Sequence, residues 1–413
     1  MKLSEELQAR GFIAQCTSDN LAEVFDEENR VIYHGIDPTA DSAHAGNFVI
    51  WMLLKHLVNY GHQIVFLVGG GTGMIGDPKP DAERVLASRE EVALRVEKIK
   101  KQAADFFGQT NVSFVDNYDW LGDLSLITFL RDIGKHFTIG ELLKKEAIAR
   151  RLQSEVGLSY TEFAYPLLQA YDYLELYQKS NVTLQVGGSD QWGNVVAGVD
   201  LVRRKAQTTV FGLTVPLIID KATGKKFGKS EGNAVWLSAV KTSPYAFYQF
   251  WLNTSDESVV DYLKLFTLLS LEEISHLANA VAEKPQERLA QKTLAAEVTK
   301  LVHGEELAKN ITRVTECLFG GLEFSSLSTE DLDLLKSNAP LTKVEEGSLL
   351  LEVLISSNLA SSKREARSFI EEGAVSVNGQ KVQDLDYHLV KSTDGELVHL
   401  KRGKKNIALV SLS

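Results

Sequence analysis

The 413-residue sequence is poor in cysteine, with only Cys16 and Cys317, which lie far apart along the chain. Two distant cysteines fit a reducing compartment and exclude a metal cage built from cysteine ligands. No run reaches the roughly 18 uninterrupted apolar residues that a membrane-spanning helix requires. The first residues, MKLSEELQARGFIAQ, indicate an amphipathic helix and lack the apolar core of a secretion signal. These absences predict a cytoplasmic protein without a membrane partner.

The sequence is also poor in proline, and its net charge is negative. Only 8 prolines leave little room for long disordered linkers, and 44% hydrophobic with 24% charged residues is typical of a folded globular chain. The length predicts two or three domains. The net charge of −11 argues against a protein that coats nucleic acid without specificity, although it allows a local basic surface.

Apolar runs alternate with helical stretches between residue 31 and about residue 220. The runs are VIYHGI, QIVFLVGG, VSFVDN, TLQVGG and LTVPLII. This alternation predicts an α/β fold with a parallel sheet and crossover helices. Because ligands bind at the carboxyl ends of the strands in such sheets, the segments that follow these runs are candidate site loops. They are GIDPTADSAHAGN, GGGTGMIGDP, DNYDW and GGSDQWGN.

The composition changes along the rest of the chain. We predict a sheet domain at 1–225, a loop and helical domain at 226–325, an acidic, serine-rich linker at 326–346 and a small α+β domain at 347–413. In the last of these, SSKREARSFIEEG predicts a helix that ends at a glycine, and AVSVNGQKV predicts a hairpin with an Asn-Gly turn. Its basic residues either form an RNA-binding surface or are simply solvated. They are Lys363, Arg364, Arg367, Lys401, Arg402, Lys404 and Lys405.

Two segments resemble nucleotide-binding motifs but fail in detail. Residues 71–76 match the GxGxxG fingerprint, yet Pro78 follows at the point where that fingerprint must open a helix. GKKFGKS, residues 224–230, lacks the first glycine of a P-loop. A nicotinamide enzyme is therefore not favoured. What remains is a loop whose Lys226 and Lys229 can hold a phosphate group.

His44 stands at the start of an apolar run, FVIWMLLKHLVNYG, that predicts a helix ending at Gly61. Asp41 or Ser42 could cap this helix. The free N–H groups and the dipole at such an end favour anions. His44 therefore acts on phosphate there, or it only packs or caps.

Three polar side chains share one face of the helix predicted around FAYPLLQAYDYL. Tyr165, Gln169 and Asp172 stand at i, i+4 and i+7 within an otherwise apolar segment. They either line a pocket for a polar ligand or form an edge that faces solvent.

These segments resemble the class I aminoacyl-tRNA synthetases. HAGN at 44–47 is similar to their HIGH signature, and KFGKS at 226–230 is similar to their KMSKS loop. Longer segments resemble bacterial tyrosyl-tRNA synthetases in order along nearly the whole chain. They are IYHGIDPTADS, LVGGGTGMIGDP, NYDW, FLRDIGKHF, YTEFAYPLLQAYD, LQVGGSDQWGN, TSPYAFYQFW and KREARSFIEEGAVSVNG. His34 replaces a cysteine of that family, and Asn47 replaces the second histidine of HIGH.

The resemblance implies a Rossmann-like catalytic domain. Such a domain joins tyrosine to ATP, releases pyrophosphate and then transfers the tyrosyl group to the 3′-terminal adenosine of tRNA(Tyr). ATP would be a substrate accompanied by Mg²⁺, with no tightly bound cofactor and no metal site in the protein. The resemblance also implies a homodimer with residues 120–155 at its interface and an anticodon contact through the helical domain.

Roles for single residues also follow from the resemblance. Catalysis and the phosphates are assigned to Thr39, His44, Asn47, Arg84, Lys226 and Lys229, and Lys79 is the nearest candidate for a lysine that assists Arg84. Tyrosine is assigned to Tyr33, Asp77, Asn117, Tyr165, Gln169, Asp172 and Gln191, with Tyr33 and Asp172 on its phenol hydroxyl. Further ATP contacts are assigned to Gly35, Asp37, Gly46, Gly188 and Asp190, and the basic residues of the terminal domain are assigned to tRNA.

Two alternatives remain open at this point. A non-catalytic RNA-binding relative would keep the fold, but the intact His44, Lys229 and Asp172 oppose it. A tryptophanyl-tRNA synthetase is opposed by the pair Tyr33 and Asp172 and by the basic terminal domain.

Overall fold

The computed structural model describes residues 1–78, 85–108, 111–153, 157–219, 221, 224, 227, 229–230, 233–320, 322, 326–338, 341–391, 397–403 and 406–413. These form two compact units, Met1–Thr242 with Phe250–Leu294, and Ser243–Gln249 with Ala295–Ser413. Within the ranges given, no helix has both the length and the apolar character needed to cross a bilayer.

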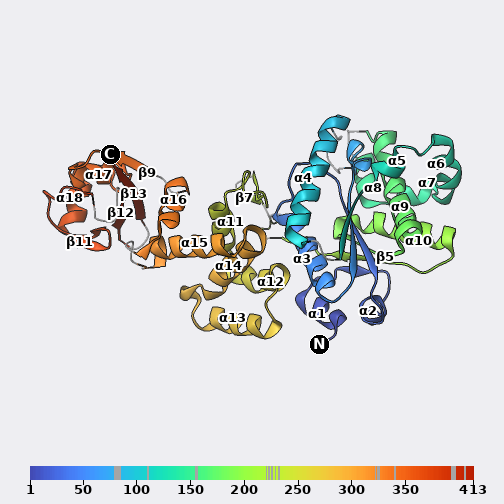
Figure 1. Ribbon diagram of the computed structural model, residues 1–413, viewed down its shortest axis with the longest axis horizontal. Coiled ribbons are helices and arrows are strands. Elements are labelled where there is room, and N and C mark those ends of the chain that lie inside the picture. Colours follow the sequence, from blue (N-terminus) through green and yellow to red (C-terminus); the bar gives the residue numbers. More distant parts are fainter. Residues whose placement is uncertain are drawn as a thin grey trace. The chain divides into compact units, whose positions relative to one another are not determined.

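A six-stranded sheet forms the centre of the first unit (Figure 1). Its order is β1-β6-β5-β2-β3-β4, and neighbouring strands are parallel except for β1, which is antiparallel to β6. The strands are β1 (Gln15–Cys16), β2 (Val31–Ile36), β3 (Gln63–Val68), β4 (Val112–Asp116), β5 (Val182–Gly188) and β6 (Phe211–Val215). The predicted parallel sheet is confirmed, since its five predicted runs coincide with β2 to β6.

Helices cover both faces of this sheet. α3 (Ala45–Asn59) and α4 (Arg89–Phe107) pack on one face, and α9 (Tyr160–Ser180) and α10 (Trp192–Ala206) pack on the other (Figure 1). Because both faces are covered, β3 and β6 are almost wholly apolar and buried. The polar segments are therefore left to the strand ends, where a site can form.

Shorter elements complete the first unit. They are α1 (Leu3–Arg10), α2 (Leu21–Phe25), η1 (Thr72–Met74), α5 (Tyr118–Leu121), α6 (Leu126–Asp132), η2 (Gly134–His136), α7 (Ile139–Leu142), α8 (Glu146–Leu152), η3 (Ser189–Gln191), β7 (Lys229–Ser230), β8 (Asn233–Ala234), α12 (Asp256–Phe266), α13 (Leu271–Glu283) and η4 (Pro285–Glu287). α11 (Pro244–Leu252) and α14 (Leu289–His303) have residues in both units. The helices predicted after residue 243 are confirmed.

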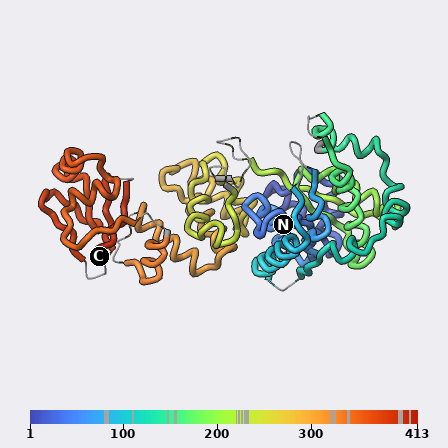
Figure 2. Tube along the Cα trace, turned by 90° about the horizontal axis from the view of Figure 1, so that it is seen from above, coloured from blue at the N-terminus to red at the C-terminus, as the bar shows by residue number. Residues whose placement is uncertain are grey.

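The second unit contains a five-stranded sheet with the order β11-β10-β12-β13-β9. Its elements are α15 (Glu305–Thr315), the π-helix η5 (Glu316–Gly320), α16 (Thr329–Asn338), β9 (Leu341–Val344), α17 (Leu350–Ser356), α18 (Lys363–Glu371), β10 (Val375–Val377), β11 (Gln380–Val382), β12 (Leu397–Arg402) and β13 (Asn406–Leu412). From α17 to the C-terminus the chain folds back on itself as one small body, drawn in red in Figure 2. Asn378 and Gly379 form the predicted turn, with φ values of 48° and 85°.

The structure differs from the linker predicted at 326–346. α16 begins at Thr329, and β9 pairs in parallel with β13. Leu335 packs with Leu397 and Leu409 in a shared apolar cluster. Of the acidic residues in this segment, Glu330 and Asp333 are exposed on α16, whereas Asp331 is buried and pairs with Arg313 at 2.9 Å. The helical domain predicted at 226–325 also differs from the division into units, because residues up to Thr242 and Phe250–Leu294 group with the sheet and the remaining helices group with the second unit.

Candidate active site

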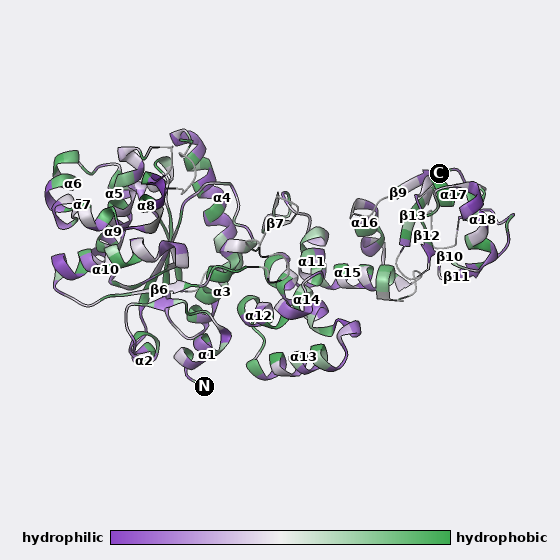
Figure 3. Ribbon diagram, turned by 180° about the vertical axis from the view of Figure 1, so that it is seen from behind, coloured by the Kyte–Doolittle hydropathy of each residue, from purple (hydrophilic) through white to green (hydrophobic). Residues whose placement is uncertain are grey.

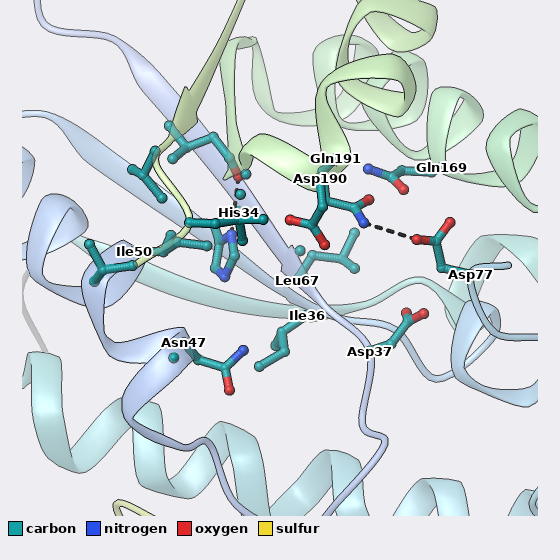
Figure 4. A pocket seen from close by; sticks show the side chains of 18 of the residues that line it. His34, Ile36, Asp37, Asn47, Ile50, Leu67, Asp77, Gln169, Asp190 and Gln191 are labelled. Atoms are coloured by element: carbon teal, nitrogen blue, oxygen red, sulfur yellow. Dashed lines mark hydrogen bonds between the residues drawn. The ribbon is translucent and has the colours of Figure 1, made fainter. Parts of the chain in front are cut away.

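A cavity of about 490 Å³ lies at the carboxyl ends of β2 and β5 (Figure 4). Most of the residues assigned from the sequence line it. They are Tyr33, Gly35, Asp37, Thr39, His44, Gly46, Asn47, Asp77, Tyr165, Gln169, Asp172, Gly188, Asp190 and Gln191. The segments predicted to meet at the strand ends therefore do meet there.

Four of the residues assigned to substrate or catalysis are not on this lining. Asn117 lies behind it, and only the backbone of Lys229, in β7, belongs to the described structure. Arg84 and Lys226 lie outside the described residues, as do Lys79 and the two lysines of the terminal turn, Lys404 and Lys405.

Asp172 and Tyr33 occupy a buried part of the cavity, with 2% and 1% of their surfaces exposed. Asp172 accepts hydrogen bonds from Asn117 Nδ2 at 3.0 Å and from Trp120 Nε1 at 2.8 Å. Burial raises the pKa of Asp172 to about 8, although these two bonds favour the charged form. Burial, with the Asp172 charge adding to it, also raises the pKa of Tyr33 well above its usual value. Together the two groups can give and accept a hydrogen bond at one buried point.

Asn117 supports Asp172 and does not reach the cavity itself. Its side chain is fully buried, and Nδ2 also donates to Thr72 Oγ1 at 2.9 Å. Its Oδ1 accepts the backbone N–H of Gly71 at 2.8 Å. The resemblance assigned Asn117 to the tyrosine amino group, and the structure instead ties it to the carboxyl group at the other end of the predicted tyrosine site.

Asp37 is held by two hydroxyl groups. Tyr165 donates to Asp37 Oδ2 and Thr72 donates to Asp37 Oδ1, both at 2.7 Å. A Cβ at Gly69 would lie 2.3 Å from Asp37 Oδ1, so glycine is required for this close approach. Burial and the carboxylates of Asp37 and Asp77 raise the pKa of Tyr165, which keeps its hydroxyl group a donor.

Asp77 is held by two amide side chains. Gln191 Nε2 donates to Asp77 Oδ2 at 2.9 Å, and Asn194 Nδ2 donates to Asp77 Oδ1 at 3.2 Å. Figure 4 shows Asp77, Gln169 and Gln191 gathered at one side of the cavity. Gln169 Oε1 is buried and has no hydrogen-bond partner among the described residues. A carboxylate and an unused carbonyl oxygen in this position suit a cationic group of a ligand.

Sequence reasoning missed Asn194. It is the last residue of GGSDQWGN, and its signal was its spacing of three residues from Gln191 at the start of a helix, which places both amides on one face.

His44 is itself the N-cap of α3, so the prediction that Asp41 or Ser42 caps this helix is wrong. His44 Nδ1 accepts the backbone N–H of Gly46 at 3.0 Å, and Asn47 Oδ1 accepts the backbone N–H of His44 at 3.2 Å. With Nδ1 an acceptor, a neutral ring carries its hydrogen on Nε2, which is then a donor. A Cβ at Gly46 would lie 2.9 Å from His44 Cε1, so glycine makes room for this ring.

Asp41 forms a different contact. It pairs with Lys241 at 2.6 Å and with Lys98 at 3.0 Å. The hydrogen bonds from Lys241 and Lys98 lower the pKa of Asp41 to about 2. This carboxylate therefore ties the turn before α3 to α4 and to the segment that follows β8.

The segment after β8 also pairs with the start of α3. Ala45 N donates to Val235 O at 2.8 Å, and Leu237 N donates to Ala43 O at 3.0 Å. The ring of Trp236 stands edge-on to His44, with 5.9 Å between the ring centres. The HAGN turn and the segment that ends the KFGKS loop are thus joined by hydrogen bonds.

His34, one of the two departures from the family signatures, lines the cavity in a neutral form. Its Nδ1 donates to Val186 O at 3.1 Å, and burial lowers its pKa to about 4. Asn47, the other departure, also lines the cavity. Both residues therefore face the predicted nucleotide side.

The GxGxxG match does not open a helix of the dinucleotide-binding type. It contains η1, a 3-10 helix of three residues, and Gly76 at its end has a φ of 81°. Over the part of the chain that is described, no three His, Cys, Asp or Glu side chains are grouped to hold a metal ion.

In the terminal domain, the predicted basic residues differ in their surroundings. Lys363 pairs with Glu352 at 3.1 Å, and Arg402 pairs with Glu365 at 3.8 Å while its guanidinium lies over the ring of Phe369. Lys401 is half-buried. Arg364 and Arg367 are exposed on α18. Together with Lys363, these two arginines are the exposed members of the described set.

Two family models match the chain. Residues 26–320 match the family described as tRNA synthetases class I (W and Y). Residues 331–410 match the domain described as tyrosine-tRNA ligase SYY-like C-terminal domain.

Similar proteins cover the whole chain. The tyrosine-tRNA ligase of Streptococcus uberis is 49% identical over 421 residues, and that of Streptococcus suis is 48% identical over the same length, with 100% of each chain covered. The crystal structure of a C-terminally truncated mitochondrial tyrosyl-tRNA synthetase from Aspergillus nidulans is similar with a TM-score of 0.69 and 30% identity, over 77% of this chain and 94% of that one. The chain therefore belongs to the class I tRNA synthetases of the tryptophan and tyrosine group.

Proposed function

We propose that the cavity at the ends of β2 and β5 activates tyrosine with ATP. The carboxylate of tyrosine attacks the α-phosphate, tyrosyl-adenylate forms, pyrophosphate leaves, and the tyrosyl group then passes to the 3′-terminal adenosine of tRNA(Tyr). The chain acts as a tyrosine-tRNA ligase, as its full-length relatives are named. The observation that carries the proposal is the buried pair Tyr33 and Asp172 on the lining of the same cavity as His44.

The phenol hydroxyl of tyrosine would lie between Tyr33 and Asp172. Asp172 is held by Asn117 and Trp120, so its carboxyl group is oriented before the ligand arrives. Phenylalanine would give neither buried group the hydrogen bond that the phenol hydroxyl makes, and Asp172 would keep only its bonds from Asn117 and Trp120. Loss of such bonds is the reason tyrosyl-tRNA synthetases are the established example of strong discrimination without editing.

The ammonium group of tyrosine would lie at Asp77, Gln169 and Tyr165. The support is a carboxylate fixed by Gln191 and an unpaired carbonyl oxygen of Gln169. The substrate supplies its own nucleophile, so the protein positions the two reactants and stabilises charge.

ATP would occupy the side formed by His44, Asn47 and Gly46, with its ribose near Gly188 and Asp190. His44 Nε2 and the Asn47 amide are donors at the start of a helix, where phosphate is favoured. Thr39 lines the same side and adds a hydroxyl group. Lys226, Lys229 and Arg84 are assigned to the leaving pyrophosphate from the sequence.

Magnesium would accompany ATP and be held by the phosphate oxygens, which are the hard ligands it prefers. The protein would supply few of the magnesium ligands, since the described residues offer no group of three His, Cys, Asp or Glu side chains and both oxygens of Asp37 already accept hydrogen bonds.

A homodimer through residues 120–155 is supported by apolar side chains on the surface of this region and of the adjoining start of α9, part of which is drawn green in Figure 3. Ile127 is 72% exposed and Leu126 is 66% exposed. Others in the region are Leu130, Ile139, Leu143, Leu152 and Tyr160. Several large apolar side chains exposed in one region favour a subunit interface.

The proposal is tested by amino-acid-dependent exchange of pyrophosphate into ATP with the full chain. We expect exchange with tyrosine and about 10⁴-fold less with phenylalanine. Exchange with tryptophan instead would identify the other branch of the family, and no exchange with any amino acid would identify a non-catalytic relative. Cell fractionation tests the predicted cytoplasmic location.

A further inference from the structure

Asn194 on α10 is a buried amide at the centre of a hydrogen-bond network beside the cavity. Its side chain is 8% exposed. Nδ2 donates to Asp77 Oδ1 at 3.2 Å and to Gln191 Oε1 at 3.1 Å, while Gln191 donates to the other oxygen of Asp77 at 2.9 Å. Asn194 therefore contacts both partners in the Asp77 to Gln191 pair and does not line the cavity itself.

Lys145, just before α8, fixes which way the Asn194 amide faces. Its Nζ donates to Asn194 Oδ1 at 3.4 Å and also to the backbone carbonyl of Gly193. An ammonium group has only donors, so it must face the oxygen of the amide. The nitrogen of Asn194 is then directed at Asp77.

A carboxylate held at both oxygens has a fixed plane. Oδ1 of Asp77 is held from Asn194 and Oδ2 from Gln191, so rotation about its terminal bond would break one bond or the other. The remaining acceptor sites on the oxygens then keep a constant direction. Such pre-organisation lowers the free-energy cost of binding a cation.

We propose that Asn194, oriented by Lys145, is a positioning residue that fixes the Asp77 carboxylate for the ammonium group of the amino-acid substrate. This inference rests on the proposed function, in which Asp77 receives that ammonium group. It assigns to the last residue of GGSDQWGN a role in the amino-acid half of the site, and it makes Lys145 an indirect determinant of the same contact.

Equilibrium binding of three compounds to the full-length protein separates this role from a general structural one. Tyrosine has the phenol, the ammonium and the carboxylate; tyramine lacks the carboxylate; 3-(4-hydroxyphenyl)propionate lacks the ammonium. In Asn194→Ala we expect the Kd of tyrosine and of tyramine to rise about tenfold, the usual cost of a lost hydrogen bond to a charged group. The Kd of the propionate should change less than twofold. Equal weakening of all three compounds, or of none, would overturn the proposal.

Lys145→Met tests the second half of the proposal. It should raise the same two Kd values by a smaller factor. The Lys145 charge also acts directly on Asp77, so in the Asn194→Ala background only this direct effect should remain, and the part that passes through the amide should be lost. Additive effects would refute the link. Lys144→Met, which removes the neighbouring exposed ammonium, is the matched control. If Asn194→Ala does not fold, Lys145→Met alone tests the proposal. The proposal still requires this variant to bind tyrosine and tyramine more weakly and the propionate with an unchanged Kd.

Exchange kinetics give a second readout. Asn194→Ala should raise the KM for tyrosine and leave the KM for ATP unchanged, with a small change in kcat. The wild-type protein also separates the two proposals. If it binds no tyrosine, the proposed function fails; if it binds tyrosine and the variants bind it equally well, only the role of Asn194 fails.

Discussion

Trp120 Nε1 donates a hydrogen bond to Asp172 Oδ1 at 2.8 Å, although Trp120 does not line the cavity. Trp120→Phe removes this donor and keeps most of the ring. We expect the KM for tyrosine in pyrophosphate exchange to rise about fivefold to tenfold, since a buried carboxyl oxygen loses a partner. The KM for ATP should not change. Tyr118→Phe, two residues earlier, is the control, and an unchanged tyrosine KM in Trp120→Phe would contradict the role of this bond.

Burial of Asp172 predicts a pH dependence of stability. Its pKa is raised from 3.8 to about 8 in the folded, unliganded protein. The folded state therefore holds a proton that the unfolded state releases, so this contribution to stability is complete below pH 3.8 and is lost as the pH rises to about 8. Relative to Asp172→Asn, the wild type should lose stability between pH 5 and pH 8, by at most about 4 kcal/mol. Thermal melts of the wild type and Asp172→Asn at pH 5 and pH 8 measure this loss of stability. Equal changes in the stability of the two proteins would refute the prediction.

Lys229→Ala tests the assignment of the KFGKS loop to the departing pyrophosphate. A group that acts mainly in the transition state should slow adenylate formation about 100-fold while the Kd of tyrosine stays within twofold. Single-turnover formation of tyrosyl-adenylate measures the rate. Lys221→Ala is a matched control, because Lys221 is exposed and pairs with Asp261 on α12. A large loss of tyrosine binding in Lys229→Ala would show that this lysine acts in binding tyrosine and not on the departing pyrophosphate.

Arg364→Gln with Arg367→Gln tests the tRNA surface in the full chain. Loss of two phosphate contacts should lower kcat/KM for tRNA charging roughly tenfold and reduce the dependence of log kcat/KM on log salt by about 1.8. Pyrophosphate exchange should not change. A chain cut after Glu345 is a poorer test, because β9 would lose its partner β13. Lys101→Gln on α4 is the control. Normal charging by the double variant would exclude α18 from the tRNA-binding surface.

Ile127→Glu tests the homodimer. A charge placed on an apolar interface costs several kcal/mol, so the variant should sediment as a monomer where the wild type sediments as a dimer. Leu94→Glu is a matched control, because Leu94 is also exposed but lies on α4. A dimeric Ile127→Glu protein would exclude α6 from the interface.

The sheet and the segments that meet at its strand ends follow from local patterns, whereas the roles of most single residues in the cavity came from the family resemblance. Strands buried on both faces are continuous apolar runs, and the polar segments between such runs must lie at the strand ends. The helical spacing of Tyr165, Gln169 and Asp172 likewise fixes their common face before any tertiary contact is known.

The errors concern tertiary contacts. Asn117 was assigned to the amino group of tyrosine, but its place depends on the distance from β4 to Asp172, which no local pattern contains. His44 caps α3 in place of Asp41 because Asp41 forms ion pairs with Lys98 and Lys241, which lie in distant segments. β9 was assigned to a linker since its partner, β13, lies at the other end of the terminal domain.

The lysine-bearing loop is anchored on both sides of Lys229. Phe227 N donates to Ile218 O, and Val235 O accepts the N–H of Ala45. Since a chain extends at most about 3.5 Å per residue, the backbone of Lys229 stays within about 7 Å of Phe227. A group held beside its target in the right orientation can act at an effective concentration of about 10⁵ M or more, which no free amine in solution can reach. Methylamine should therefore fail to restore Lys229→Ala, because the anchored backbone supplies the concentration as well as the charge.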